Sequence, residues 1–360
     1  MHGTLRHRRA YYHCADCGRG HCPDDEHLGL DGHWSPTLQP AVTLLGALVP
    51  FATASDLLRQ LTGLRFSTST CRRVTERVGA DLQAQHQQHQ AVAPPRLPDW
   101  DFAQPERDGQ RFPGTVGYVG LDAFAVPTRG RGGVDWKMLY VGLLYDPPKE
   151  HTLYLVDYDF ERLAGLLRPY AIALGFGRAE RVVALTDGGN GLERVLRQGV
   201  SDAVVCVLDW WHLSEKLYEL GGLLHAQDAA AQAWAKAREA TLWEQGGAAL
   251  VAELDRLGCP PEAPAAAAER WHEVRNHVDK NRHRTAYPEY RARGWDVGSG
   301  PTEAGCKVVG QRVKGAGMRW LQGSSLEVAA LKALYASGLG LWEAFWTHRK
   351  PGYCSEPSQN

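Results

Sequence analysis

One stretch of this 360-residue chain decides the expected fold: Val116-Gly-Tyr-Val-Gly-Leu-Asp122-Ala-Phe-Ala-Val126. Its β-branched and aromatic residues predict a strand, and residues 138–145 and 152–156 predict two more. A helix is expected next, around 160–174. Three strands before the first helix favour a meander within a sheet that helices cover.

Two further strands are predicted by short apolar runs that each end on an acid, Arg181-Val-Val-Ala-Leu-Thr-Asp187 and Ala203-Val-Val-Cys-Val-Leu-Asp209. A helix over about 190–198 separates them, and another is expected to begin at Trp210. This order is that of an RNase H-like domain, an α/β fold with a mixed five-stranded sheet and helices on its faces.

Asp122 and Asp187 end apolar half-strands, where packing gives no reason for an acid because burying an unpaired carboxylate is costly. In an open α/β sheet such strand ends face the crevice in which ligands bind. Two carboxylates held close together repel each other, and a divalent cation such as Mg²⁺ relieves that repulsion. The alternative for Asp187 is a cap on the helix that follows.

A third acid stands in Gly298-Ser-Gly-Pro-Thr-Glu303-Ala-Gly-Cys-Lys307. Pro301 suits the first turn of a helix, and Lys307 lies one turn after Glu303 on the same face. Glu303 could serve only to complement the helix dipole. That alternative leaves the basic residues behind it unexplained. These residues are Lys307, Arg312, Lys314 and Arg319.

The net charge of −1 excludes a uniformly basic coat for nucleic acid, but it conceals a segregation of charge. Residues 270–319 carry a net charge of +6 and residues 1–22 carry +3. Aromatic residues interleave the basic ones over 270–319. Such a segment is typical of a surface that follows a phosphate backbone and stacks bases. A solvated helical face is the alternative.

The segment Asp209-Trp-Trp-His212 begins the helix after the fifth strand. Asp209 could cap that helix, and His212 could lie in the core. Because the pair stands after two of the acids and before the third, we favour a place near the same cleft.

Residues 1–34 contain the pair Cys14-Ala-Asp-Cys17, whose spacing is that of two zinc ligands. A structural zinc needs four ligands, so the sequence allows a filled or an incomplete site, and we describe 1–34 as a partial zinc-knuckle segment. Over 35–90 we expect helices. Thr62-Gly63 ends one, and residues 67–70 offer caps for the next, which carries Arg72 and Arg73. This is the pattern of a helix-turn-helix that binds DNA, and an αα-hairpin with a basic face is the alternative.

Composition excludes several classes of protein and indicates the domain boundaries. Hydrophobic residues make up 44% of the chain and charged residues 22%, so wholesale disorder is not expected. No apolar run has the roughly 20 residues of a membrane span, and the N-terminus lacks the apolar stretch of a secretory signal. We expect a Pro-rich linker over 91–114, the first part of the core over 115–225, an all-helical insertion over 226–297, helices with Glu303 over 298–346 and a tail over 347–360.

Five motifs stand in the order seen in bacterial insertion-sequence transposases, and the chain most resembles the ISKra-type branch, which is related to Mutator-like DDE transposases. The motifs are Val-Gly-Leu-Asp122, Leu-Thr-Asp187-Gly-Gly-Asn-Gly, Leu-Asp209-Trp-Trp-His212-Leu-Ser-Glu-Lys, Asn281-Arg-His-Arg284 with Tyr287, and Gly298-Ser-Gly-Pro-Thr-Glu303-Ala-Gly-Cys-Lys307. The last motif, which continues to Trp320, is the most specific. The likeness covers about 10–346.

The resemblance implies that Asp122, Asp187 and Glu303 form a DDE triad holding two Mg²⁺ or Mn²⁺ ions for phosphoryl transfer. It also implies that Asp209 and His212 help to position DNA. We expect DNA contacts from the basic residues Arg284, Lys307, Arg312, Lys314 and Arg319. Members of the family usually carry a further Cys-x-x-Cys before the pair seen here, which puts zinc binding by Cys14 and Cys17 in doubt.

We therefore expect a DNA transposase that cleaves the terminal inverted repeats of its own element and transfers the strands to target DNA. It would act as a homo-oligomer in the assembled complex, in the cytoplasm and associated with the nucleoid. One alternative is a DNA-binding protein without catalysis, derived from a decayed or domesticated transposase. Another is a metal-dependent nuclease that lacks the joining step.

Overall fold

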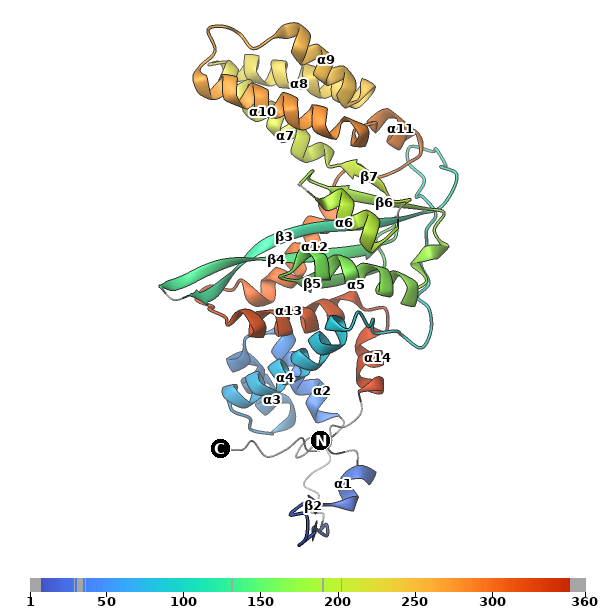
Figure 1. Ribbon diagram of the computed structural model, residues 1–360, viewed down its shortest axis with the longest axis vertical. Helices are drawn as coiled ribbons and strands as arrows, with labels where there is room; N and C mark the ends of the chain where they lie inside the picture. The colour runs from blue at the N-terminus through green and yellow to red at the C-terminus, as the bar shows by residue number, and fades with distance from the viewer. Residues whose placement is uncertain are drawn as a thin grey trace.

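The computed structural model describes residues 8–28, 30, 35, 37–130, 132–189, 191–201 and 203–349. Residues 1–7 and 350–360, which hold the start of the expected zinc-knuckle segment and most of the expected tail, lie outside the described residues. Figure 1 shows an elongated arrangement, with helices near the N-terminus at the bottom, a sheet in the middle and a group of helices at the top.

A five-stranded mixed sheet forms the centre of the molecule. Its strands are β3 (Val116–Gly130), β4 (Gly133–Tyr145), β5 (Thr152–Asp157), β6 (Arg181–Thr186) and β7 (Val205–Leu208). They lie in the order β5-β4-β3-β6-β7. The pairs β3–β4 and β4–β5 are antiparallel, whereas β3–β6 and β6–β7 are parallel. The predicted α/β class, the meander and the mixed five-stranded sheet are confirmed.

Strands β3 and β4 are longer than predicted. Their pairing continues to Gly130 and Gly133, so the two strands extend beyond the sheet as a ribbon (Figure 1). Residues 134, 136 and 138 of this ribbon are exposed. A search for apolar runs misses such a segment, because its pairing comes from backbone hydrogen bonds and not from burial.

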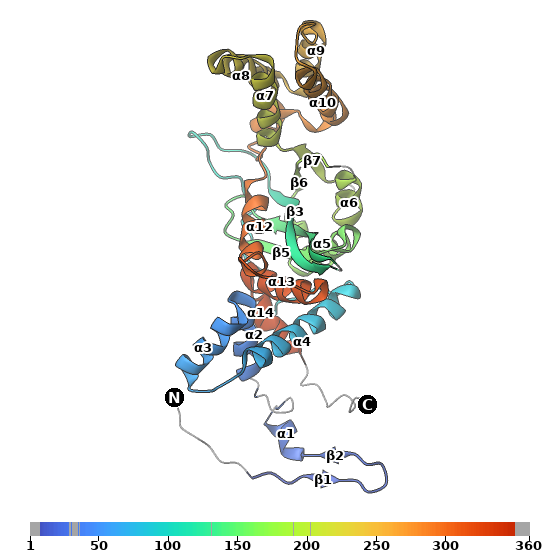
Figure 2. The same ribbon diagram turned by 90° about the vertical axis from the view of Figure 1, so that its left-hand side faces the viewer.

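Helices cover both faces of the sheet, as Figure 2 shows. On one face lie α5 (Phe160–Ala173) and α6 (Leu192–Gly199), with the 3₁₀ turn η1 (Phe176–Arg178) following α5. On the other lies α12 (Gly300–Val313), which packs on β3 and β4. Helix α13 (Gln322–Ser337) packs on β5, and α14 (Leu341–His348) follows it. The helices predicted over 298–346 are confirmed, with α12 and α13 on either side of Gly315–Gly317.

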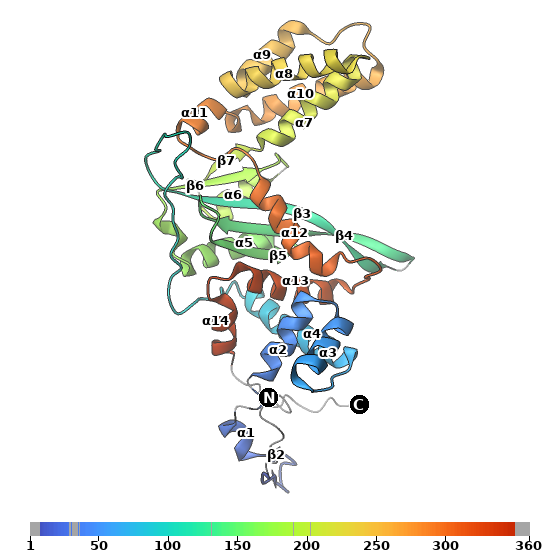
Figure 3. The same cartoon turned by 180° about the vertical axis from the view of Figure 1, so that it is seen from behind.

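The N-terminal helices pack against the core through α13 (Figure 3). They are α2 (Leu38–Leu48), α3 (Phe51–Thr62) and α4 (Thr68–Gln87), preceded by β1 (Tyr12–His13), β2 (Gly20–His21) and α1 (Pro23–His27). Gly63 ends α3 with a φ of 74°, which a glycine adopts without strain. The Ser67 hydroxyl accepts a hydrogen bond from the Thr70 amide at 3.0 Å, so the predicted cap of α4 is confirmed.

The segment 91–114 contains no helix or strand, and all of its residues are described. It is nevertheless not a free linker, because Val92, Trp100 and Phe102 are buried in the core. The ring of Trp100 stacks on that of Phe102, and both meet Phe176 edge to face. The prolines prevent regular structure, while the aromatic side chains hold the segment along the sheet.

The segment between β7 and α12 is helical, as predicted. It comprises α7 (Trp210–Leu224), α8 (Asp228–Gln245), α9 (Gly247–Leu257), α10 (Ala265–Asn281), the 3₁₀ turn η2 (Arg282–Arg284) and α11 (Tyr287–Ala292). These helices form the upper part of Figure 1. None of the helices in the described part of the chain has the length and apolarity that a membrane crossing needs.

Candidate active site

Asp122 and Asp187 follow the paired parts of two neighbouring parallel strands, β3 and β6. These parallel strands are in register from Val116 opposite Arg181 to Gly120 opposite Leu185. Two residues further along the same register are Asp122 and Asp187. Both carboxylates are exposed. Asp122 lies within β3, which continues to Gly130, whereas Asp187 comes directly after the end of β6.

Helix α12 lies close enough to β3 to bring Glu303 to the same edge. A Cβ atom at Gly120 would lie 2.0 Å from the Thr302 hydroxyl, so only glycine permits this approach. Asp122 and Glu303 line one open groove of about 650 Å³, together with Phe124, Cys306, Lys307 and Lys314. Two carboxylates and two ammonium groups thus share the groove.

Hydrogen bonds fix the Asp122 carboxylate. Its Oδ1 accepts from the Ala123 amide at 2.7 Å, and its Oδ2 accepts from the Cys306 thiol at 3.4 Å. Burial and the neighbouring Asp122 charge raise the pKa of Cys306, so the thiol stays protonated and acts as the donor. Each carboxylate oxygen keeps a free lone pair for a ligand in the groove.

Asp187 does not cap the following helix, which was the alternative for it. Its Oδ1 accepts from the Gly189 amide at 3.0 Å, whereas the N-cap of α6 is Gly191, with no side-chain bond. Gly188 has a φ of 86°, and a Cβ there would lie 3.1 Å from the ring of His277. The carboxylate is therefore held by a local turn and stays exposed.

Asp209 differs from both acids because it is only 1% exposed. Its Oδ1 accepts from the His212 amide at 3.0 Å and so caps α7. Its Oδ2 accepts from the Ser299 amide at 2.5 Å, one residue before α12. Through these two hydrogen bonds the Asp209 side chain holds the start of the helix that carries Glu303.

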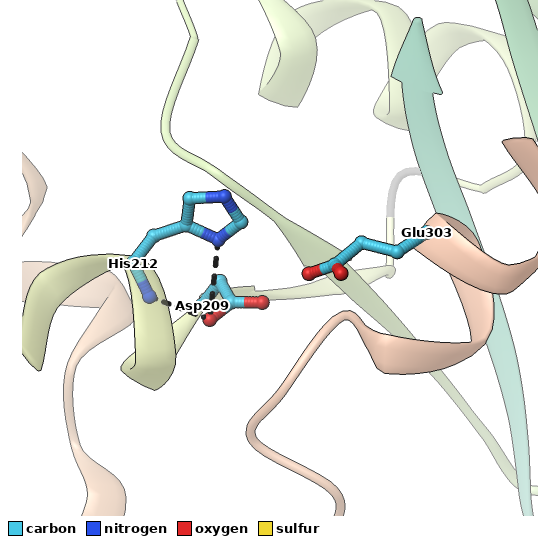
Figure 4. A group of neighbouring side chains, drawn as sticks. All are labelled: Asp209, His212 and Glu303. Atoms are coloured by element: carbon cyan, nitrogen blue, oxygen red, sulfur yellow. Dashed lines mark hydrogen bonds and ion pairs between the residues drawn. The ribbon is translucent and has the colours of Figure 1, made fainter. Parts of the chain in front are cut away.

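Figure 4 shows Asp209, His212 and Glu303 pointing toward one another. One potential ligand atom from each lies within 4.8 Å of the others, and no further group of three or more such residues meets this spacing in the described part of the chain. The His212 Nδ1 lies 3.5 Å from the Asp209 Oδ1. The triple Asp122, Asp187 and Glu303 does not meet this spacing.

Comparisons with known proteins offer no further guidance. No family model matches the chain, and no curated protein does. The function is therefore inferred from the residues and their geometry.

The basic residues expected to contact DNA divide into two sets. Lys307 and Lys314 line the groove beside Glu303, and Arg319 is exposed. Arg284 and Arg312 are only 3% and 2% exposed. The structure buries these two side chains, whereas the sequence offers no reason to separate them from the exposed members of the set. A charge tally cannot separate the two sets, because burial depends on the helices that cover them.

Arg284 and Tyr287 join the helical segment to the strand ends. The Arg284 Nη2 donates to the Thr186 hydroxyl, next to Asp187, and the Tyr287 hydroxyl donates to the Leu208 carbonyl at 3.0 Å. The motif around Arg284 thus supports the backbone on which Asp187 and Asp209 stand.

Two residues of the site carry no strong sequence signal. Ser299 contributes only its backbone amide, which any residue would supply. His277 lies in α10 against Gly188, where burial lowers the pKa of its imidazole and Lys216 adds to the effect. A single histidine about 90 positions after Asp187 does not stand out in the sequence.

Cys14 and Cys17 lie at a hairpin formed by β1 and β2. The Cys14 amide donates to the Arg19 carbonyl at 2.8 Å, and both cysteines are exposed. Hydrogen bonds from the backbone and side chain of Cys17 lower the pKa of Cys14. Among the described residues no group of three or more potential metal ligands includes the pair, whereas a structural zinc needs four ligands.

Proposed function

We propose that this protein is a DNA transposase with an RNase H-like catalytic core. Asp122, Asp187 and Glu303 would hold two Mg²⁺ or Mn²⁺ ions, and DNA would be cut at the ends of the element and joined to a target. The observation that carries the proposal is the groove lined by Asp122 and Glu303, with Asp187 directly after β6, the strand that pairs in parallel with β3.

The donor set fits the proposed ions. Asp122, Asp187 and Glu303 are exposed carboxylates, and hard oxygen ligands of this kind suit Mg²⁺ and Mn²⁺. When bound, such ions activate the attacking oxygen and stabilise the leaving one. The strand order β5-β4-β3-β6-β7 supports the RNase H-like assignment.

The groups around the triad have separate tasks in this proposal. Lys307 and Lys314 would bind the phosphate backbone in the groove, since a lysine ammonium group attracts the negative charge of a phosphate. Asp209 would act as a positioning residue that holds the start of α12 and thereby Glu303. The exposed Arg72 and Arg73 on α4 would help to recognise the terminal inverted repeats. His212 would lie beside the scissile strand.

The test is strand cleavage by the purified chain with Mg²⁺, on labelled DNA carrying the sequences that flank the gene. Wild-type protein should nick the DNA at the element end, and Asp122→Asn should not. Asp99→Asn is the matched control, because Asp99 is an exposed acid outside the groove and its loss should leave cleavage unchanged. Equal cleavage by Asp122→Asn would overturn the triad.

A second candidate is a DNA-binding protein without catalysis. It is favoured by one observation, that the three triad carboxylates do not reach the 4.8 Å spacing that Asp209, His212 and Glu303 do. Tight DNA binding with no cleavage in either Mg²⁺ or Mn²⁺ would support it. Cleavage without joining to a second DNA would indicate a nuclease.

A further inference from the structure

A second pocket lies away from the triad, between the N-terminal helices, the end of β3 and the loop after α12. It has a volume of about 380 Å³, which is in the range of small-ligand sites. Its walls come from the start of α3, the face of α4, the end of β3 and the loop between α12 and α13. Figure 3 shows these elements around the lower end of α12.

The pocket is strongly basic. Four arginines line it, against the single acid Glu76. The arginines are Arg72, Arg129, Arg312 and Arg319. Arg129 and Arg319 are exposed, and neither forms an ion pair within the described part of the chain. Glu76 lies 3.9 Å from Arg72, so it offsets one guanidinium at most. The net charge left in the pocket attracts anions.

Arg312 is the buried member of this set. Its Nε donates to the Gly46 carbonyl at 2.9 Å, and its guanidinium lies 4.7 Å from the ring centre of Phe51 and 5.1 Å from that of Trp320. Among the described residues no carboxylate pairs with it, and its Nη2 has no hydrogen-bond partner there. Burying a charge without an ionic partner is costly. Burial also lowers the pKa of Arg312 to about 10.

The surroundings of Arg312 are rigid. Trp320 donates from its backbone amide to the Pro127 carbonyl at 3.1 Å, and the Arg129 amide donates back to the Trp320 carbonyl at 2.8 Å. The indole of Trp320 donates to the Val313 carbonyl at 3.0 Å. The pocket is thus built on fixed backbone, and an occupant would meet a preformed arrangement of arginines.

We propose that this pocket binds a phosphate group of DNA, with Arg129, Arg312 and Arg319 as its ligands. Arginine is suited to this task because its planar guanidinium donates two parallel hydrogen bonds to phosphate oxygens. The inference rests on the proposed function in so far as DNA is the source of the phosphate. Arg72 belongs both to the pocket and to the basic face of α4, so a strand bound on α4 leads into the pocket.

Arg312 connects the pocket to the active site, because it lies on the same helix as Glu303. Arg312 stands nine residues after Glu303 on α12, roughly 13 Å along the same helix. A phosphate held between α4 and α12 therefore joins the N-terminal helices to the helix that carries Glu303. Recognition of the element end and alignment of the catalytic groove would be linked through one rigid element.

The first experiment measures how the full chain binds a labelled duplex of about 20 base pairs at several salt concentrations. For the double variant Arg129→Gln with Arg319→Gln, we expect about tenfold weaker binding. The salt slope should also fall by about 1 for each DNA phosphate that the variant no longer neutralises. Arg256→Gln on α9 is the matched control, since Arg256 is exposed and far along the chain from the pocket. Its salt slope should stay unchanged.

The second experiment separates DNA from free phosphate. Inorganic phosphate should raise the Tm of the wild type, as a ligand of the native state does, and should raise it less in Arg312→Gln and in the double variant. If duplex binding is unaffected by the variants but the phosphate effect disappears, the site takes free phosphate. If neither readout changes in the double variant, which alters only exposed residues, the pocket is not a phosphate site. Neither readout uses cleavage, so a failure of the transposase proposal is detected separately.

Discussion

The ends of β6 and β7 carry the same sequence pattern, but the aspartate that follows the strand is exposed in one case and buried in the other. Each strand is a short apolar run followed by an aspartate. Asp187 after β6 is exposed and accepts a hydrogen bond from the local Gly189 amide. Asp209 after β7 is buried and accepts from two amides, those of His212 and Ser299. The difference shows that a strand-ending acid becomes a ligand or a structural cap according to the donors that other segments bring to it.

The largest effect is expected at Asp187. Asp187→Asn should reduce DNA cleavage by roughly a hundredfold or more, the scale of losing one electrostatic group from a catalytic site. Its free energy of unfolding should stay within about 0.5 kcal/mol of the wild type, as for other exposed positions. Cleavage assays and urea unfolding of the same preparation check both. A variant that cleaves normally would remove Asp187 from the proposed triad.

At Asp209, in contrast to Asp187, we expect a large loss of stability. Asp209→Ala removes the cap of α7 and leaves the Ser299 amide unpaired, so the free energy of unfolding should fall by about 2–4 kcal/mol. Asp209→Asn keeps one acceptor oxygen and should lose less. Urea unfolding measures the change. If Asp209→Ala were as stable as the wild type, the side chain would not hold α12 in the way described.

The smallest effect is expected at Tyr287, which supports the end of β7 from outside. Tyr287→Phe deletes the hydrogen bond to the Leu208 carbonyl and should cost about 1 kcal/mol. Because Leu208 precedes Asp209, cleavage should fall only slightly. Tyr218→Phe is a control, since the Tyr218 side chain is exposed and its hydroxyl donates to Glu239 at 3.3 Å. A loss at Tyr287 no larger than that at Tyr218 would mean that this hydrogen bond adds nothing to the strand end.

Much of the fold could be predicted from local patterns. Apolar runs located the five strands, and the Ser67 cap and Gly63 located the turn between α3 and α4. The ribbon beyond Pro127 was missed, because its exposed residues have no apolar period. The prolines of the segment 91–114 predict a linker. The structure buries Trp100 and Phe102 of this segment in the core, and the sequence does not show this because their packing partners lie elsewhere in the chain.

The sequence identified the acidic residues of the candidate site, but it did not show which basic residues are exposed and which are buried. Asp122, Asp187 and Glu303 were identified from strand ends and a helix start, which are local features. Arg284 and Arg312 were expected on a DNA-facing surface with the lysines, because a tally of charge carries no information about burial. Arg312 meets Gly46, which lies 266 residues away in the chain.

The sequence by itself determined the order of helices and strands and the acids that end them, because these depend on the residues within one or two turns of backbone. Only the tertiary structure decided which carboxylate faces the groove, which one is buried, and which arginines leave the surface. Those outcomes depend on donors and rings supplied by distant segments. Ser299 reaches Asp209 across 90 residues, and that hydrogen bond ties the cap of α7 to the start of the helix that carries Glu303.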